Sequence, residues 1–443
     1  MSLAIIILAA GKGTRMKSAK PKVMHTLAGK PMLQHVIDTA KQLSPSQLAV
    51  VSGNGADEVV PFLQNQQIDV VMQHEQKGTG HAVEQAKASF VNSEQVLVLY
   101  GDVPLITADT LQDLIESGDN NSLKVLTAIL EDPTGYGRIV RDYEESKLIN
   151  EINTGIMCIP AKWLTEALSQ LDNNNTQGEY YLTDLIAKAV NQGIEINSVT
   201  CEDEMEVAGI NNRVQLAEVE SYYQQLKATE LMMSGVTFRD PARVDIRGDI
   251  KAGQDITIDI NVIFEGNNTI ADNVSIGANC ILINSTIHEG AEILPNSIIE
   301  NAEVGTNCSV GPFARLRPGT KLAAKAKVGN FVEVKNANIG LGSKINHLSY
   351  IGDTDMGADV NIGAGTITCN YDGANKHRTV IGDRVFVGSD TQLVAPVTVE
   401  DGATIGAGST IRKTAPADSL TLTKSEQKTV KGWQRPIKKK NTG

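Results

Sequence analysis

Aliphatic residues return at every sixth position through much of the second half of the chain. One unbroken series is Val304, Val310, Leu316, Leu322, Val328 and Val334, and another is Ile381, Val387, Leu393, Val399, Ile405 and Ile411. A small residue commonly follows the aliphatic one, as in Val328-Gly329. This period is typical of a parallel β-helix, in which each hexad forms one flat side of a coil and its aliphatic side chain points inward. An ordinary strand-rich domain would need two such series by chance, so we favour the β-helix.

Polar residues that interrupt the hexads are where the function of a β-helix is expected, because aliphatic coils carry no reactive groups. The phase slips by one residue at Ile339 and again at Met356, and residues 368–379 contain an insertion. His347 lies between the two slips and follows the inward-pointing Ile345 by two positions. We therefore expect its imidazole to face away from the core and towards a groove.

A histidine in this place suits acyl transfer. Imidazole titrates near neutral pH, so it can take a proton from an ammonium nucleophile as the nitrogen attacks a coenzyme A thioester. A lone histidine is more often structural. A metal site would need three convergent histidines, and the spacing of His288, His347 and His377 shows no such set.

The first half of the chain has a different organisation. Over residues 1–213, apolar segments at 3–8, 48–52, 69–73 and 95–100 are predicted strands, and helix-like stretches separate them. This alternation predicts a Rossmann-like α/β domain with a mostly parallel sheet covered on both faces. Near-helical spacing over residues 214–233, before Gly235, predicts a connecting helix. We expect domains at 1–213 and 235–443, joined by a helical linker at 214–234.

Two features of the first half predict a phosphate site. Leu8-Ala9-Ala10-Gly11-Lys12-Gly13-Thr14-Arg15-Met16 follows a strand, so the glycines can bring backbone N–H groups against phosphate. It fits neither the dinucleotide nor the Walker pattern. Arg15 and Lys22 can hold a triphosphate and offset the charge that builds on the reacting phosphorus. Asp102 ends a buried-looking strand, at the sheet edge where ligands bind. Its carboxylate can bind Mg²⁺ together with one amide oxygen. Alternatively, it only caps the turn that follows.

Charge and hydropathy exclude other classes of partner. The net charge is −12, which disfavours general binding to nucleic acid. The apolar run near the start, at residues 5–10, is far short of the ~20 residues of a membrane span. We expect a cytoplasmic enzyme with small-molecule substrates and no integral membrane segment.

Motifs of the first half resemble a known family, the bacterial bifunctional N-acetylglucosamine-1-phosphate uridylyltransferases and glucosamine-1-phosphate N-acetyltransferases. They are the glycine loop, Gly78-Thr79-Gly80-His81-Ala82, Tyr100-Gly101-Asp102, Gly135-Tyr136-Gly137-Arg138, Glu151-Ile152-Asn153-Thr154-Gly155 and Gly209-Ile210-Asn211-Asn212-Arg213. The resemblance implies that UTP and UDP-N-acetylglucosamine contact Leu8, Ala9, Ala10, Gly11, Lys22, Gln73, Gly78, Thr79, Tyr100, Gly101, Asp102, Gly137, Asn153 and Asn211. Gly137 and Asn153 would hold the sugar, and Asp102 and Asn211 would carry Mg²⁺.

The second half resembles the acetyltransferase part of the same family. The matching motifs are Arg315-Leu316-Arg317-Pro318-Gly319, residues 329–335, 347–350 and 361–366, and Asn370-Tyr371-Asp372-Gly373. The resemblance implies a left-handed coil, a homotrimer and His347 as the general base. Glucosamine-1-phosphate would be bound by Arg317, Lys335, Tyr350 and Asn361, and acetyl-CoA by Ala364, Asn370, Tyr371, Ser389, Ala407 and Lys424. The family usually has arginine where Lys424 stands, and lysine lacks the planar fork of arginine.

One interval departs from the family. Family members have a longer segment between Arg138 and Glu151, with a glutamate that contacts the sugar, whereas only residues 139–150 fill it here. Either the segment is genuinely shorter or part of it is missing from the sequence, and the abrupt Tyr143-Glu144-Glu145-Ser146 run favours the second. We assign that glutamate to no residue.

Three hypotheses follow for the function. The leading one is acetylation of glucosamine-1-phosphate followed by uridylyl transfer, which supplies UDP-N-acetylglucosamine for peptidoglycan and lipopolysaccharide. A second is a nucleotidyltransferase for another sugar with a regulatory β-helix, against which His347, Lys335 and Asn370-Tyr371 count. A third makes the β-helix an oligomerisation scaffold without catalysis.

Overall fold

A computed structural model describes residues 2–134, 136–140, 149–424 and 426–436. The chain divides into two compact units, Met1–Ala228 with Ile246–Gly248, and Thr229–Asp245 with Asp249–Gly443. The predicted connecting helix is present as α7 (Arg213–Met233). The border between the units falls inside this helix, at Ala228. Within the described residues, no helix is both long and apolar enough to cross a membrane.

Unit 1 contains a seven-stranded sheet. Its strands, in spatial order, are β5 (Asp69–Met72), β4 (Gln47–Ser52), β1 (Leu3–Ala9), β6 (Gln95–Tyr100), β8 (Glu151–Pro160), β7 (Leu123–Ile129) and β9 (Ile196–Cys201). Strands β5, β4, β1 and β6 run parallel, and they are the four strands that the sequence predicts. Strand β8 is antiparallel to both of its neighbours. The sheet is thus mostly parallel, as predicted, with one reversed strand.

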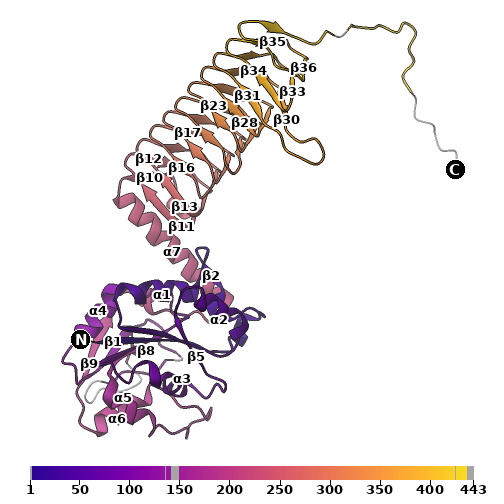
Figure 1. The fold of residues 1–443 in the computed structure, drawn as a ribbon. Coiled ribbons are helices and arrows are strands. Elements are labelled where there is room, and N and C mark those ends of the chain that lie inside the picture. Colours follow the sequence, from indigo (N-terminus) through magenta and orange to yellow (C-terminus); the bar gives the residue numbers. More distant parts are fainter. Residues whose placement is uncertain (1, 135, 141–148, 425, 437–443) are drawn as a thin grey trace, which may run out of the picture. The chain divides into compact units, whose positions relative to one another are not determined.

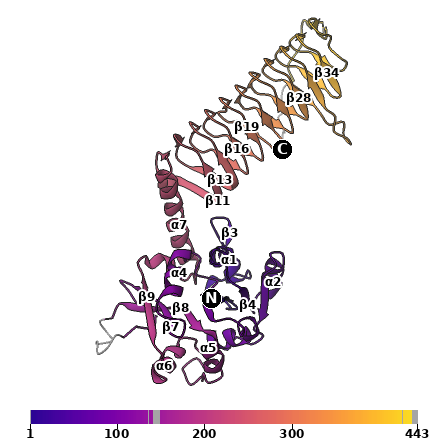
Figure 2. The ribbon, with the colours of Figure 1, turned by 60° about the vertical axis from the view of Figure 1, so that its left-hand side comes forward.

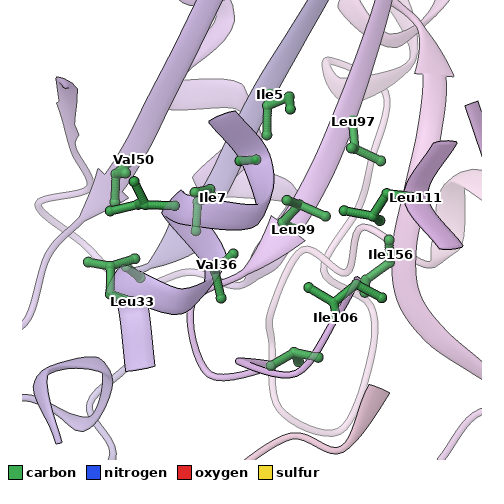
Figure 3. Packing of buried hydrophobic residues seen from close by; sticks show 14 of the residues in the cluster. Ile5, Ile7, Leu33, Val36, Val50, Leu97, Leu99, Ile106, Leu111 and Ile156 are labelled. Carbon is green, nitrogen blue, oxygen red and sulfur yellow. The ribbon is translucent and has the colours of Figure 1, made fainter. Parts of the chain in front are cut away.

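Helices cover both faces of this sheet (Figures 1 and 2). One face packs against α1 (Met32–Gln42), α2 (Ala56–Gln64) and α4 (Ala108–Glu116), and the other against α3 (Thr79–Gln85), α5 (Ala161–Leu168) and α6 (Asp184–Asn191). Side chains of β1 alternate between two cores: Ile5 and Ile7 join the first, and Ile6 and Leu8 the second. Figure 3 shows Ile5 and Ile7 in the first core, with Leu33 and Val36 of α1 among their companions. A strand apolar on both faces must be central, which places the loop after β1 in the middle of the sheet edge.

Unit 2 is a stack of short parallel strands (Figure 1). One sheet contains β10 (Val236–Phe238), β12 (Ile256–Ile258), β14 (Ser275–Ile276), β17 (Glu292–Ile293), β20 (Ser309–Val310), β23 (Lys327–Asn330), β26 (Lys344–His347), β29 (Asn361–Ile362), β32 (Phe386–Val387), β35 (Thr404–Ile405) and β37 (Leu420–Thr421). The remaining sides comprise β11 (Val244–Ala252), β13 (Val262–Ile270), β15 (Ile281–Ile283), β16 (Thr286–Ile287), β18 (Ile298–Glu300), β19 (Glu303–Val304), β21 (Arg315–Leu316), β22 (Lys321–Leu322), β24 (Glu333–Lys335), β25 (Asn338–Ile339), β27 (Tyr350–Gly352), β28 (Thr354–Met356), β30 (Ile367–Cys369), β31 (Thr379–Ile381), β33 (Gln392–Val394), β34 (Val397–Val399) and β36 (Thr410–Ile411). The predicted parallel β-helix is confirmed.

The hexads set the length of each coil. Every residue of the two predicted aliphatic series is buried. Val304 pairs with Leu322, three full hexads later. Leu322 pairs with Ile339, which is one residue short of three hexads. The phase slips are therefore coils shortened by one residue. Beyond Ala415 the chain leaves the hexad pattern but still adds one strand, because Thr421 pairs with Ile405.

Close stacking of the coils explains the small residue after each aliphatic one. A Cβ atom built on Gly329 would lie 2.0 Å from the carbonyl oxygen of Asn346 in the next coil. We expect Gly329→Ala to destabilise unit 2 by about 1–3 kcal/mol, because the backbone of one coil must move away. Denaturant unfolding measures this loss, with Lys327→Ala, an exposed change on the same strand, as control. Equal unfolding midpoints for the two variants would contradict the explanation.

Candidate active sites

A cavity of about 370 Å³ opens in unit 1 at the carboxyl ends of β1 and β6. Ten residues that the family resemblance assigns to nucleotide binding line it: Leu8, Ala9, Ala10, Gly11, Lys22, Gln73, Gly78, Thr79, Tyr100 and Asp102. They come from strand ends, loops and helix starts far apart in sequence that parallel strands bring to one edge of the sheet. The structure therefore places the glycine loop and the acidic strand end in one cavity.

The glycine loop is shaped by a close approach to Lys22. Gly13 has φ +57°, and a Cβ atom there would lie 2.7 Å from Lys22 Cβ. Around Gly11, by contrast, a Cβ atom would meet no heavy atom within 4 Å. The loop thus packs on one side and leaves its backbone open on the other, as a phosphate-binding loop requires.

Two cations and two oxygen-bearing side chains meet beside this loop. Lys22 Nζ, in the short helix η2 (Lys22–Met24), contacts the Asp102 carboxylate and lies 3.2 Å from Asn211 Oδ1. Arg15 Nη2 donates to the same Asn211 oxygen at 2.8 Å. The backbone oxygen of Asp102 accepts from Ile210 N at 2.9 Å, which fixes the loop that carries Asn211. Four residues from separate parts of unit 1 therefore form one cluster.

The Asp102 and Asn211 oxygens fit a divalent cation. Both are hard oxygen donors of the kind that Mg²⁺ prefers, and both already contact one positive group, the Lys22 ammonium. A group of three or more His, Cys, Asp or Glu residues is not found in the described parts of the chain. Any cation here would therefore need oxygen atoms from substrate or water as well.

Tyr100 lines the same cavity. Burial raises the pKa of its hydroxyl, and the negative charge of Asp102 raises that pKa further. The hydroxyl therefore stays protonated across the physiological pH range.

Gly137 and Asn153 line a different cavity of unit 1, of about 560 Å³, together with residues of β7, α6 and β9. Asn153 N donates to Gly137 O at 2.9 Å, and Asn153 Oδ1 accepts from Gly155 N at 2.8 Å. The resemblance treats these two residues as one site with the glycine loop, but they are not part of the lining of the first cavity. Residues 141–148 of the interval between Arg138 and Glu151, and Gly135, lie outside the described residues.

In unit 2, His347 is exposed at the end of β26. Its Nδ1 lies 2.8 Å from Asn330 Oδ1, and the two residues pair on adjacent strands β23 and β26. If that amide oxygen accepts, Nδ1 carries the proton and Nε2 keeps its lone pair, which is the tautomer of a base. The sequence interpretation missed Asn330; its place one coil before His347 was the available signal.

Residues assigned to acetyl-CoA form a column with His347. Ile345 pairs with Ile362, Ile362 with Val387, and Val387 with Ile405. Two positions after these four residues, the same register gives His347, Ala364, Ser389 and Ala407. Small side chains thus follow the histidine from coil to coil, just beyond the ends of β29, β32 and β35. Asn361 begins β29 in the same sheet, and Lys424 is exposed in the tail.

A cluster of cations lies on the neighbouring sheet. Arg317 Nη1 donates to Glu333 Oε1 at 2.8 Å, and this hydrogen bond raises the pKa of Arg317. The positive charge of the nearby Lys376 lowers the pKa of Lys335, and that of Arg317 lowers it further. Tyr350 starts β27 beside them, paired with Glu333. Like charges this close favour an anionic ligand, and Lys376 is a member that the sequence interpretation missed.

The insertion is a hairpin in which Tyr371 pairs with Lys376, and Figure 1 shows an orange loop projecting beside β30. Its turn is held by Asp372, which accepts from the backbone N of Asn375 at 2.7 Å and of Ala374 at 2.8 Å and contacts His377 Nε2 at 2.7 Å. These hydrogen bonds lower the pKa of Asp372, and the one from Asn375 N has the largest effect.

The base of the hairpin is anchored on a buried carboxylate. Asn370 Nδ2 donates to Asp353 Oδ2 at 2.5 Å, and Asn336 Nδ2 donates to the other oxygen of the same carboxylate. Asp353 was also missing from the sequence interpretation, because its partner Asn370 lies 17 residues away, on the next coil.

Family models of known proteins match the two halves of the chain separately. The MobA-like NTP transferase domain matches residues 5–186, the GMPPB C-terminal domain matches residues 246–344, and six bacterial transferase hexapeptides match residues 378–413. A solved nucleotidyl transferase from Methanothermobacter thermautotroptrophicus covers 51% of this chain and 99% of its own at 18% identity, with a TM-score of 0.39, too low to support a conclusion.

Three relatives match almost the whole chain, and each is named bifunctional protein GlmU. The protein of Janthinobacterium sp. (strain Marseille) is 54% identical over 98% of this chain and 99% of its own. That of Marinobacter nauticus is 51% identical over 98% and 99%, and that of Stutzerimonas stutzeri is 53% identical over 99% and 100%.

Proposed function

This chain belongs to the family of bifunctional GlmU proteins, and from that premise we propose that its two sites catalyse successive steps of UDP-N-acetylglucosamine synthesis. It is both an acetyltransferase that uses acetyl-CoA and a uridylyltransferase that uses UTP. Residues 235–443 acetylate glucosamine-1-phosphate, residues 1–213 couple the product to UTP, and residues 214–234 link them. The observation that carries this assignment is that one chain holds an exposed imidazole and a cation cluster in unit 2, and a phosphate loop beside a carboxylate in unit 1.

In the acetyl-transfer step, His347 Nε2 accepts a proton from the substrate amine as its nitrogen attacks the thioester carbon. The carbon–sulfur bond breaks, the proton taken up by His347 passes to the sulfur, and coenzyme A leaves as its thiol. Asn330 holds the ring through Nδ1, so that the lone pair of Nε2 stays available. Arg317, Lys335 and Lys376 bind the sugar phosphate, with Tyr350 and Asn361 beside it. Ala364, Asn370, Tyr371, Ser389, Ala407 and Lys424 contact acetyl-CoA.

In the uridylyl step, a phosphate oxygen of the sugar attacks the α-phosphorus of UTP, and the bond to pyrophosphate breaks. Lys22 and Arg15 offset the negative charge that develops on the phosphates. Asp102 and Asn211 hold Mg²⁺, which supplies further charge neutralisation when bound. The backbone at residues 8–11, with Gln73, Gly78, Thr79, Tyr100 and Gly101, binds the nucleotide, and Gly137 and Asn153 hold the sugar.

We also propose that the protein is a homotrimer that works in the cytoplasm. Its product would serve the synthesis of peptidoglycan and lipopolysaccharide. Support for association comes from Phe313 and Phe331, which are 50% and 56% exposed and stack with ring centroids 5.3 Å apart. Phe331 directly follows Asn330, so this apolar corner adjoins the histidine.

The cation cluster predicts a pH dependence of substrate binding. Because Lys376 lowers the pKa of Lys335, part of the positive charge should be lost as pH rises through that lowered pKa, and affinity for glucosamine-1-phosphate should fall. In Lys376→Met the pKa of Lys335 returns towards its ordinary value, so the fall should begin at higher pH. Calorimetric titration from neutral pH to about pH 11 measures the affinity of the wild type and of Lys376→Met. The substrate ionises in the same way in both titrations, so a difference between the two profiles comes from the protein. A profile unchanged from wild type would contradict the pairing; Lys327→Met is the control.

A paired assay of free thiol and pyrophosphate tests the function as a whole. With glucosamine-1-phosphate and acetyl-CoA, thiol should appear, and pyrophosphate should follow only once UTP is added. Thiol release without any later pyrophosphate would refute the uridylyl assignment, and pyrophosphate from glucosamine-1-phosphate and UTP alone would refute the proposed order.

A further inference from the structure

Gln73 presents only one end of its amide to the nucleotide cavity. Its side-chain nitrogen, Nε2, contacts two groups, the backbone oxygen of Gly78 at 3.2 Å and His81 Nδ1 at 2.9 Å. Gly78 O can only accept, so the nitrogen must be the donor, and both of its hydrogens are used. Among the described residues, none donates to Gln73 Oε1. Because Gln73 lines the cavity, its Oε1 is the side-chain polar atom that remains for a ligand to contact.

The two groups that orient the amide are themselves fixed. Gly78 has φ +107°, and a Cβ atom there would lie 2.5 Å from Tyr180 O, so the chain is closely packed at this point. Gly80 N donates to Tyr180 O at 2.8 Å, which ties the start of α3 to the same segment. His81 lies on the first turn of α3, and its Nε2 is 3.3 Å from the side-chain amide of Gln85. To accept from Gln73, His81 must carry its ring proton on Nε2. Gln85 Nε2 is also a donor, so in this tautomer the Gln85 amide must turn its oxygen to the ring to accept that proton.

We propose that His81 is a positioning residue that sets the nucleobase preference of the uridylyl site by holding Gln73 with its oxygen towards the base. This inference rests on the proposed function. Uracil has an N3–H donor that such an oxygen can accept, whereas the N3 of cytosine is an acceptor and would face the oxygen unpaired. A site built around a fixed acceptor rejects a base that lacks the donor, because a buried polar group is then left unsatisfied.

Two substitutions at one position separate positioning from packing. His81→Leu removes the acceptor and frees the amide of Gln73 to rotate. His81→Asn keeps a side-chain oxygen that can accept near the place of Nδ1. The ratio of kcat/KM for UTP to that for CTP should fall about five- to tenfold in His81→Leu, as expected for the loss of one neutral hydrogen bond, and stay within about twofold in His81→Asn. A purely structural role would lower both rates together and leave the ratio unchanged.

Acetyl transfer by the same chain and the melting temperature report whether each variant is intact. If His81→Leu does not fold, His81→Ala carries the same prediction, with dissociation constants for UDP and CDP in place of turnover. A wild-type ratio in the leucine or alanine variant, or an equal fall in the asparagine variant, overturns the role of His81. A wild-type enzyme that transfers no uridylyl group from UTP would instead refute the proposed function.

Discussion

Replacing His347 with alanine is expected to slow acetyl transfer by about 10²–10⁴-fold, the range typical of a lost general base. The amine of the substrate would then have no group to take its proton as the carbon–nitrogen bond forms. Binding should change little, because the cations Arg317, Lys335 and Lys376 come from other strands and from the insertion hairpin. The effect should therefore appear in kcat for thiol release far more than in KM.

The same variant should release pyrophosphate from UTP and N-acetylglucosamine-1-phosphate at the wild-type rate. Asn330→Ala is the matched comparison: it frees the ring but leaves the base, so its loss should be smaller than that of His347→Ala. A folded His347→Ala protein with near-normal thiol release would show that another group accepts the proton. Loss of both activities would show that the two reactions are not carried by separate sites.

Asp102→Ala should reduce uridylyl transfer by at least about 10²–10³-fold, because charge on the phosphates is stabilised by groups that this carboxylate holds in place. The change removes a partner of Lys22 and one of two proposed Mg²⁺ ligands together. Pyrophosphate release as a function of Mg²⁺ concentration separates these effects. Asp102→Asn should need more Mg²⁺ than wild type, and chelation with EDTA should stop uridylyl transfer in the wild type while thiol release continues.

Asp109→Ala, which removes an exposed carboxylate in the first turn of α4, is the control for the change in charge. It should leave both activities near wild type. An unchanged Mg²⁺ requirement in Asp102→Asn would remove Asp102 from the proposed metal site, whatever its effect on rate.

The β-helix was predictable because one aliphatic residue marks each hexad in the sequence. Each inward position needs an aliphatic side chain and each close approach a small one, so the hexads can be found without knowing any contact. The coils before Val304 escaped this search: Ile276 pairs with Ile293 and Ile293 with Val310, one residue short of three hexads. Repeated short coils break a strict six-residue count while keeping the stacking.

Contacts between coils were not predictable in the same way. Asn330, Asp353 and Lys376 act on neighbours that lie a coil or an insertion away, and no local pattern marks them. In unit 1, strand ends indicated the edge of the sheet where Asp102 and the glycine loop meet. Gly137 and Asn153 line another cavity, beside the antiparallel strand β8, whose direction its apolar sequence does not specify.

Mixing two inactivated proteins tests most directly whether one chain carries two independent sites. Asp102→Ala and His347→Ala are purified separately and supplied with glucosamine-1-phosphate, acetyl-CoA, UTP and Mg²⁺. Neither protein alone should form UDP-N-acetylglucosamine, but the mixture should, because the acetylated sugar diffuses from one protein to the other. A mixture of folded, singly active proteins that forms no UDP-N-acetylglucosamine would contradict the account.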